Sequence, residues 1–375
     1  MACLLFVFLQ GAWSCLRQNI DVKARHSSFL RLVAAVFVKS RRGKKGRVVI
    51  NGRKTGTLKL TNWNDFFRLF KVFVDGQWVF RGQESAEWHL QSSLERDYAA
   101  FERESQRNAA DRSRQFFVGA SVANEKFAIE NFRRMADRRL ASPGSLVETL
   151  AVMQHYGART RLLDFSYSIA VALHFAYAAR ATNKPRAVWA VNLGHLISRN
   201  EELKGELGRF AKTLVESDRK LHVKRCVWMQ DIANELAPKL IPLADRCIAG
   251  KSSECGILPI QLPGNNERLI AQSGLFLFPK NFNSFEENLA ESLGLDACEV
   301  TTISDNFPMG DDFHTSDLHD CDLIKIEFDK EMESRARAIL DLMNVSSQNL
   351  FPGLEGIAQN VRYAYGKAID DKGAK

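Results

Sequence analysis

The stretch Val152–Ala176 constrains the fold most, because it embeds charged and amide side chains in an otherwise apolar sequence. Its polar members include Gln154, His155, Arg161 and Asp164. A polar group that is buried without a hydrogen-bond partner destabilises a protein, so side chains in such surroundings must find partners or do chemistry. The stretch therefore predicts the centre of the fold and a candidate functional site at the same place.

Two helices are expected in and around this stretch, separated by a tight turn and a short buried segment. Apolar residues spaced i, i+4 and i+7 after Ser145 predict a helix that begins there and buries one face. Gly157 is expected to end that helix. Ser166 or Ser168 can cap the second helix, whose small alanine side chains favour close packing.

Motifs in four separate places resemble those of the FRG domain family. The central one is Gln-His-Tyr-Gly at 154–157 followed by Thr-Arg-Leu-Leu-Asp at 160–164, and the aromatic-Arg-Gly motif that gives the family its name is matched at 80–82. Residues 267–276 resemble the family's Arg-x-x-x-Gln-x-Gly-x-Phe segment, and residues 350–356 resemble its C-terminal Phe-Pro-x-Leu-x-Gly segment. The resemblance thus covers most of the chain.

Polar residues from these separated segments are expected to converge on one pocket, because each lies at the edge of an expected strand or helix. The candidate ligand-binding residues are Arg81, Gly82, Gln83, Gln154, Thr160, Arg161, Arg268 and Gln272. The candidate catalytic residues are His155, Asp164 and Glu327. A structural alternative stays open for Arg161 and Asp164, since a buried ion pair between them would serve the fold alone.

Arg81 is the strongest of the ligand-binding candidates. We expect a strand over Gln77–Arg81 that ends at Gly82, so that the guanidinium is delivered to a flexible corner. Its planar set of donors suits a phosphate or a carboxylate. The alternative is an arginine that holds the corner by pairing with Glu84 or Asp164.

Two classes of function are consistent with these residues. In the first, the protein is an enzyme. The aromatic-Arg-Gly motif is similar to the first strand of arginine-type ADP-ribosyltransferases, where the arginine holds a phosphate of NAD. That likeness makes NAD the candidate cofactor and Glu327 the candidate glutamate, although a clear Ser-Thr-Ser strand and a Glu-x-Glu loop are missing. In the second, the protein is a non-catalytic module that binds a nucleotide or another phosphorylated ligand.

The expected fold is α+β, with a mixed β-sheet wrapped by helices and a helical insertion. We expect a basic N-terminal extension at 1–56 and an FRG domain core at 57–195. A helical insertion is expected at 196–256, and residues 257–375 are expected to complete the FRG-type fold. The sequence contains no phosphate-binding glycine loop, no Gly-x-Ser-x-Gly motif and no His-Glu-x-x-His motif, which argues against several common enzyme classes.

The charge of the chain suggests a further partner. The formal net charge is +8, and many of the basic residues lie in Lys23–Lys59. Such a block can bind the phosphates of a nucleic acid, or it can be a solvated tail. Nucleic acid is therefore a candidate partner through this segment.

Cysteine spacing and hydropathy predict the surroundings of the protein. The seven cysteines form no Cys-x-x-Cys pair and no metal-ligand spacing, which predicts no metal site and is typical of reduced thiols in the cytoplasm. The apolar run Leu4–Leu9 is too short to span a membrane and lacks the positive flank of a signal peptide. We therefore expect a cytoplasmic protein that has no membrane partner.

Overall fold

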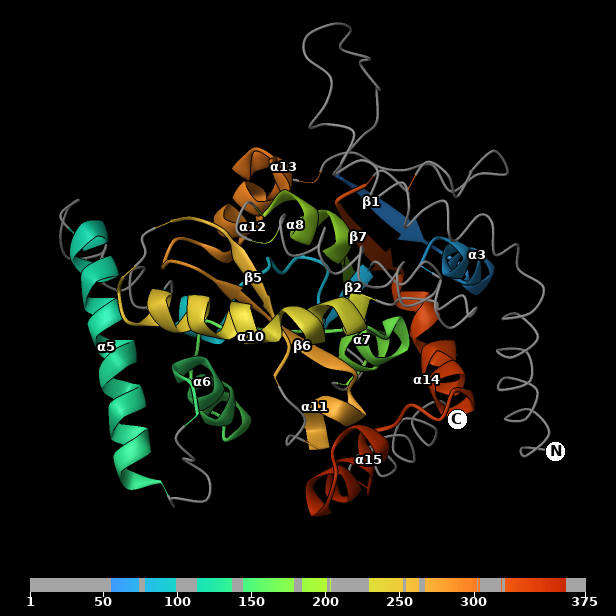
Figure 1. Ribbon diagram of the computed structural model, residues 1–375. Coiled ribbons are helices and arrows are strands. Elements are labelled where there is room, and N and C mark those ends of the chain that lie inside the picture. The colour runs from blue at the N-terminus through green and yellow to red at the C-terminus, as the bar shows by residue number, and fades with distance from the viewer. Residues whose placement is uncertain are drawn as a thin grey trace, which may run out of the picture. The chain divides into compact units, whose positions relative to one another are not determined.

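A seven-stranded mixed sheet organises the structure, a computed structural model (Figure 1). In spatial order the strands are β1 (Thr55–Leu60), β7 (Leu323–Phe328), β4 (Arg186–Asn192), β2 (Trp78–Gln83), β3 (Leu163–Ser166), β6 (Gly274–Pro279) and β5 (Ile257–Ile260). The edge strand β1 runs parallel to β7, and all the other neighbours are antiparallel. The expectation of a mixed sheet is thereby confirmed.

The structure describes residues 55–73, 78–98, 113–136, 144–178, 184–200, 203, 229–251, 254–262, 267–301, 303, 318 and 321–361. All of them belong to one compact unit, made of residues 50–203 and 225–375. Of the basic segment Lys23–Lys59, only Thr55–Lys59 lies within the described residues. The prediction that this segment contacts nucleic acid therefore stays a prediction.

Helices surround the sheet, as the α+β expectation requires (Figure 1). They include α3 (Trp63–Phe73), α5 (Ser113–Met135), α6 (Leu146–His155), α7 (Ile169–Ala176), α8 (Leu193–Arg199), α10 (Met229–Ile248), α11 (Glu267–Ala271), α12 (Phe285–Leu293), α13 (Ala297–Thr301), α14 (Glu333–Leu342) and α15 (Ser347–Leu350). Every residue of β4, β5 and β6 is buried, so these strands are covered on both faces. Within the described residues, no helix is long and apolar enough to cross a bilayer.

The main apolar core joins α3, α7 and α14 to β1, β7, β4 and β2. Aromatic rings form its centre: the Phe66 ring lies 5.5 Å from that of Phe328, and the Trp63 ring 6.0 Å from it. Apolar burial is the main stabilising contribution in such a core. The core fixes α7 and β2, and β2 carries the candidates Arg81, Gly82 and Gln83.

Local capping signals place the two helices of the central stretch as predicted. Ser145 caps α6, because its side chain accepts the Glu148 backbone N–H while the Glu148 carboxylate accepts the Ser145 backbone N–H. Ser168 caps α7 by accepting the backbone N–H of Val171. Both helix starts are therefore confirmed, and Ser168, not Ser166, caps the second helix.

The prediction that β2 ends at Arg81 and turns at Gly82 is wrong. The strand continues to Gln83, and Gly82 lies inside it, against the backbone of α7. A Cβ atom added at Gly82 would lie 1.8 Å from the carbonyl oxygen of Ala172 and 2.6 Å from the backbone nitrogen of Ala176. The glycine is therefore required for a close approach of helix and strand, as glycines inside strands often are.

Arg161 does not pair with Asp164. Its guanidinium binds the Glu125 carboxylate of α5, with Nη2–Oε2 and Nε–Oε1 distances of 2.7 and 3.1 Å. The same group lies over the rings of Phe278 and Phe282, at 4.5 and 4.3 Å from their centroids. Arg161 therefore fastens α5 to the sheet, while Asp164 is left to the cavity described below.

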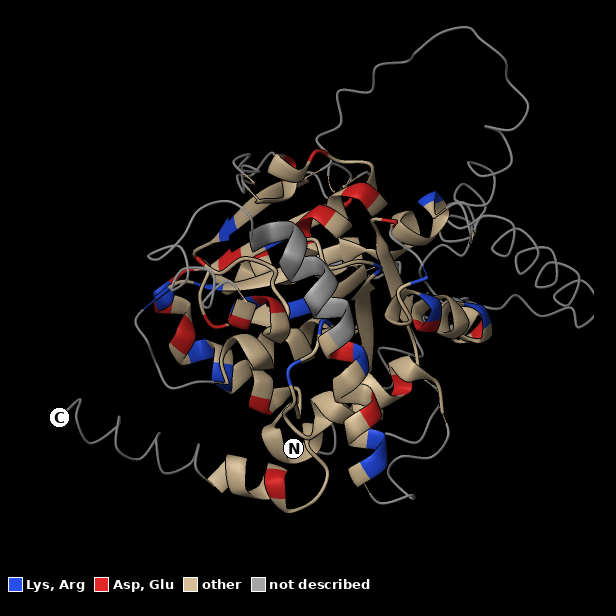
Figure 2. Ribbon diagram, turned by 90° about the vertical axis from the view of Figure 1, so that its left-hand side faces the viewer, with Lys and Arg blue, Asp and Glu red and all other residues tan. Residues whose placement is uncertain are grey.

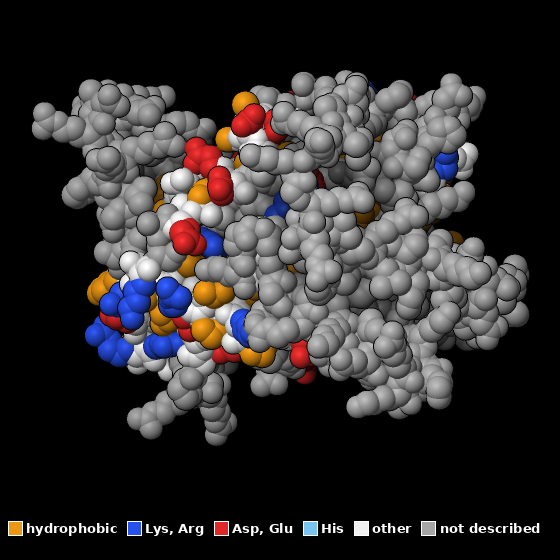
Figure 3. All heavy atoms as spheres, turned by 45° about the horizontal axis from the view of Figure 1, so that its top comes forward, with side chains coloured by type: hydrophobic (Ala, Val, Ile, Leu, Met, Phe, Trp, Pro, Cys, Tyr) orange, Lys and Arg blue, Asp and Glu red, His pale blue; other side chains and the backbone are white. Residues whose placement is uncertain are grey.

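The described surface carries charges of both signs. On the side of the molecule that Figure 2 shows, acidic and basic residues are intermixed over the described elements. In Figure 3, acidic side chains gather at the upper left and basic ones at the lower left. Basic and acidic charge are therefore concentrated on different parts of the described surface in this view.

Candidate functional site

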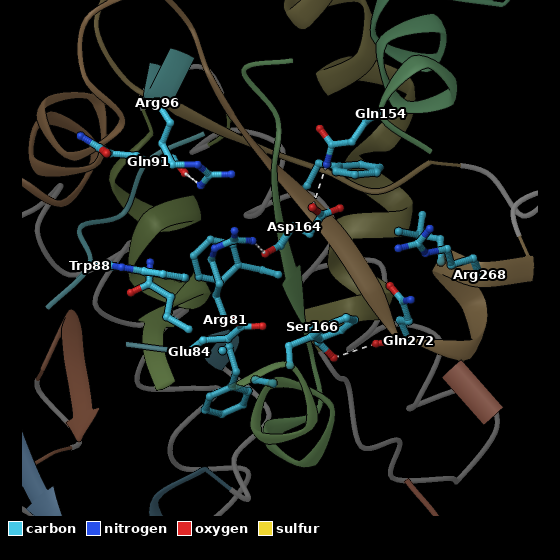
Figure 4. Close-up of a pocket in the computed structure, with 18 of the residues that line it drawn as sticks. Arg81, Glu84, Trp88, Gln91, Arg96, Gln154, Asp164, Ser166, Arg268 and Gln272 are labelled. Atoms are coloured by element: carbon cyan, nitrogen blue, oxygen red, sulfur yellow. Dashed lines mark hydrogen bonds between the residues drawn. The ribbon is translucent and has the colours of Figure 1, made fainter. Parts of the chain in front are cut away.

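A cavity of about 740 Å³ lies among β2, β3, α6, α7, α11 and the segment that follows β2 (Figure 4). Its volume is in the range of small-molecule and cofactor sites. The sequence-predicted residues that line it are Arg81, Gly82, Gln83, Gln154, His155, Asp164, Arg268 and Gln272. The topology thus brings together residues from motifs that are far apart in the chain.

Arg81 lies in the middle of the cavity wall, and in Figure 4 it stands between Arg96 and Arg268. Its Nη1 donates to the backbone carbonyl of Asp164 at 2.8 Å. Its Nε is buried and has no hydrogen-bond partner. Burial lowers the pKa of Arg81 and the nearby Arg96 lowers it further, whereas Asp164 acts in the opposite direction.

A chain of hydrogen bonds orients the Asp164 carboxylate. The side-chain amide of Gln154 donates to Asp164 Oδ2 at 2.7 Å, and the amide oxygen of Gln154 accepts the hydroxyl of Thr160. Thr160 is fully buried, and its hydroxyl also accepts the backbone N–H of Leu162 at 3.2 Å. Thr160 therefore lies behind the cavity wall, where it fixes the direction in which Gln154 donates.

Electrostatics make Asp164 an unusual carboxylate. Its side chain is open to the cavity but surrounded by protein, and this burial raises its pKa, against the opposing effects of Arg81, Arg268 and the hydrogen bond from Gln154. A carboxyl group in such a position can accept hydrogen bonds, hold a proton or face a developing positive charge.

The side chain of Gln83 supports the wall of the cavity. Its amide nitrogen donates to the backbone carbonyl of His89 at 2.9 Å, and its amide oxygen accepts the indole N–H of Trp189 at 2.7 Å. Gln83 is also buried. It therefore holds the segment that follows β2, and its amide is committed to protein partners.

Arg268 lies on α11 and Gln272 follows directly after it, on the other side of the cavity in Figure 4. The Arg268 guanidinium lies over the ring of Phe351, 4.4 Å from its centroid. The Gln272 side-chain amide donates to the carbonyl of Leu350 at 3.1 Å, and the Gln272 backbone carbonyl accepts the Ser166 hydroxyl at 2.7 Å. These contacts set the position of the α11 wall.

Two of the three catalytic candidates lie in the cavity and one lies outside it. His155 lines the cavity at the exposed end of α6, with its ring edge-to-face against Tyr156 at 5.0 Å. Glu327 lies on β7, where its carboxylate binds Lys325 at 3.0 Å, and it is not among the residues that line the cavity. Arg161 is also outside the lining, because it is bound to Glu125.

The sequence did not single out the post-β2 segment, residues 84–96, as part of the site. Its residues in the cavity wall are Glu84, Glu87, Trp88, His89, Gln91 and Arg96. The segment has no periodic pattern, so its position is set by tertiary contacts. One signal was available: Trp88 is a large aromatic residue in a polar stretch, and its side chain is half exposed.

Two carboxylates of the protein hold the post-β2 segment against α12. Glu286 accepts the backbone N–H of Leu90 at 3.1 Å and contacts Nδ1 of His89 at 3.3 Å. Glu95 accepts the backbone N–H of Phe285 at 3.3 Å. The wall that carries Trp88 and Arg96 is therefore anchored by acidic groups.

We expect Glu95 to make stability depend on pH. Burial raises its pKa to about 7, with Glu286 and Glu287 adding to the effect and hydrogen bonds from Ser92 and Phe285 opposing it. A glutamate in an unfolded chain titrates near about 4.3, so between these values the folded state binds more protons. The free energy of unfolding should therefore fall as pH rises through this window. In Glu95→Gln that part of the fall should be absent when urea unfolding is measured at pH 5 and pH 8.

A control variant separates this effect from general acidity. Glu87→Gln changes an exposed carboxylate on the same segment and should keep the parent's pH dependence. If Glu95→Gln also kept it, Glu95 would not be the titrating group.

Comparison with known proteins gives a match to one family model, over part of the chain. Residues 76–185 match the FRG domain model, which confirms the family expected from the motifs. No curated protein and no solved structure matches the chain. Within the described residues, no group of three or more His, Cys, Asp or Glu side chains is arranged to hold a metal ion.

Proposed function

Because the chain carries an FRG domain at residues 76–185, we propose that this domain binds a nucleotide or a similar phosphorylated ligand in the cavity. The observation that carries the proposal is that three arginines, Arg81, Arg96 and Arg268, line the same cavity. Arginine is the side chain best suited to bind phosphate through parallel hydrogen bonds.

The mutual repulsion of the cavity arginines supports an anionic ligand. Arg96 lowers the pKa of Arg81, which means that the two cations repel each other across the cavity wall. A phosphate bound near both would replace this repulsion by attraction.

The size and the aromatic content of the cavity favour a ligand that also carries a ring. A volume of about 740 Å³ is large enough for a nucleotide, and NAD is one candidate. The indole of Trp88, 53% exposed, offers a flat surface on which a base can stack. A nucleotide could place its phosphates on the arginines and its base on Trp88, and would thereby contact both the charged and the aromatic residues of the cavity.

The test is substitution of Arg81 by lysine, which keeps the positive charge but replaces the planar guanidinium by an ammonium group. Lysine can still donate to the Asp164 carbonyl, so the melting temperature should stay near that of the parent. It cannot make two parallel bonds, so the affinity for NAD or ADP, measured by calorimetric titration, should fall at least about tenfold. Arg159→Lys is the matched control, because Arg159 is exposed and pairs with Asp97 outside the cavity.

Two outcomes would contradict the proposal. A parent protein that binds none of NAD, ADP and inorganic pyrophosphate has no such site. A large fall in melting temperature on Arg81→Lys with unchanged affinity would assign Arg81 to the fold.

Asp164 favours a second candidate, an ADP-ribosyltransferase-like reaction on NAD. In such a reaction the bond between nicotinamide and the ribose breaks, the electron pair leaves with nicotinamide, and the sugar becomes positively charged. Water or an acceptor side chain then bonds to the same ribose carbon and releases its proton to the solvent. A carboxylate fixed beside that carbon stabilises the charge. Asp164 is held by Gln154 and flanked by arginines that could hold the phosphates, whereas Glu327 is bound to Lys325.

Asp164→Asn tests this candidate. Nicotinamide release from NAD should be lost, while Glu327→Gln should leave it unchanged. Because burial raises the pKa of Asp164, its ionised form costs stability above its unfolded pKa, so Asp164→Asn should be at least as stable as the parent at pH 7. If the parent protein bound NAD but released no nicotinamide, the transferase reaction would be ruled out and a non-catalytic binding module would remain.

A further inference from the structure

The short helix α11 forms one wall of the cavity, and burial of its own side chains does little to hold it in place. None of the five residues of α11 is buried, although Arg268 at its second position lines the cavity. A helix this short is marginal by itself and needs contacts from elsewhere. The contacts come in part from the C-terminal segment Ser347–Phe351, which lies outside the region that the family model covers.

Phe351 is the centre of these contacts. It is buried, at 7% exposure, and packs with Val171 and Leu350 in a small apolar cluster. Its ring meets that of Phe175, a cavity-lining residue, edge-to-face at 6.0 Å. Its ring also lies under the Arg268 guanidinium at 4.4 Å.

The chain around Phe351 is itself fixed by close packing. A Cβ atom added at Gly356 would lie 2.1 Å from the Phe351 carbonyl oxygen and 2.6 Å from that of Ser347. Only glycine allows the backbone to return so closely onto these carbonyls. The glycine of the C-terminal motif therefore has a physical role, which is to close the turn that presents Phe351.

We propose that Phe351 is a positioning residue that orients Arg268 for ligand binding, so that the C-terminal segment completes the pocket. This inference rests on the proposed function, in which Arg268 binds the anionic part of the ligand. A guanidinium over an aromatic face is attracted to the negative ring face. The ring thereby restricts the plane of the guanidinium, and less conformational entropy is lost when a phosphate binds.

The first experiment is a double-mutant cycle on ligand affinity. Phe351→Met keeps an apolar side chain of similar reach but removes the ring, and should weaken ADP binding about two- to fivefold. Arg268→Met should weaken it at least about tenfold. In the Arg268→Met background, Phe351→Met should have no further effect, because its action passes through Arg268. Equal weakening in both backgrounds would overturn the proposal.

A variant that keeps the shape of the ring guards against loss of folding. Pentafluorophenylalanine at position 351 has the shape of phenylalanine but a ring face that is no longer negative. It should weaken ADP binding as Phe351→Met does and leave the melting temperature near that of the parent. Phe351→Tyr keeps an electron-rich ring and should therefore bind ADP with an affinity close to that of the parent. Parental affinity with the fluorinated ring would contradict the role of the ring face.

A readout without ligand separates this inference from the proposed function. Phenylglyoxal modifies arginines, and peptide mass spectrometry reports the rate at each site. Phe351→Met should raise the rate at Arg268 several-fold and leave that at Arg159, which is exposed in the parent, unchanged. If the parent bound no ADP but this rate rose, the proposed function would fail and the positioning of Arg268 by Phe351 would stand. An unchanged rate would refute the positioning, whatever the protein binds.

Discussion

Substituting Glu125 by leucine should lower the free energy of unfolding by about 3–5 kcal/mol, because it leaves the buried guanidinium of Arg161 without its counter-ion. Both side chains are buried, and two hydrogen bonds join them. The remaining partners of Arg161 are the carbonyls of Pro279 and Lys280, each at 3.3 Å, which do not neutralise its charge. Urea unfolding followed by circular dichroism would measure the loss.

Two further variants make the experiment specific. Replacing both partners, as in Glu125→Leu with Arg161→Met, should recover most of the loss, because no charge is then left buried. Asp97→Ala removes the partner of Arg159 in an exposed pair and should cost less than about 1 kcal/mol. A Glu125→Leu variant no less stable than Asp97→Ala would show that Arg161 finds another way to compensate its charge.

Substituting Gly82 by alanine should have the second large effect. The added methyl group would meet backbone atoms of α7 at 1.8 and 2.6 Å, and backbone cannot move aside as a flexible side chain can. Helix and strand must separate, at a cost of about 3 kcal/mol by the scale of overpacked cores. The affinity for ADP should fall as well, since α7 carries the cavity residues Ala172 and Phe175.

Gly157 provides the matched control for this prediction. Like Gly82, it lies in one of the motifs that resemble the family. Its φ is positive, at 87°, and no atom lies within 4 Å of a Cβ added there. Gly157→Ala should therefore cost about 1 kcal/mol from backbone conformation alone. Thermal melts of the two variants should differ clearly, and equal melts would mean that α7 does not approach β2 so closely.

Local signals in the sequence were sufficient for several elements. The caps at Ser145 and Ser168 are set by side chains that bond to backbone groups three residues away, so they can be read without knowing the fold. The family motifs marked most of the cavity residues, because those motifs combine polar side chains with apolar neighbours.

Other features depend on contacts that no local pattern encodes. The partner of Arg161 is Glu125, which lies 36 residues earlier on another element. The role of Gly82 depends on the distance between two backbones, which the sequence does not contain. Glu327 was chosen for its residue type, but its neighbour Lys325 shares the same face of the strand and binds it.

The strand order sets a condition on how the chain can acquire its fold during synthesis. Strand β7 comes late in the chain but pairs with both β1 and β4. Neither of these two strands has its β7 partner until residues 323–328 have left the ribosome. Pairing of such distant segments is slow, and unpaired edges expose nascent chains to aggregation. A fragment limited to residues 76–185 would contain β2 and β3 but lack β4 and β6, the neighbours on their outer sides. The region recognisable as a family unit is thus smaller than the unit that can fold cooperatively.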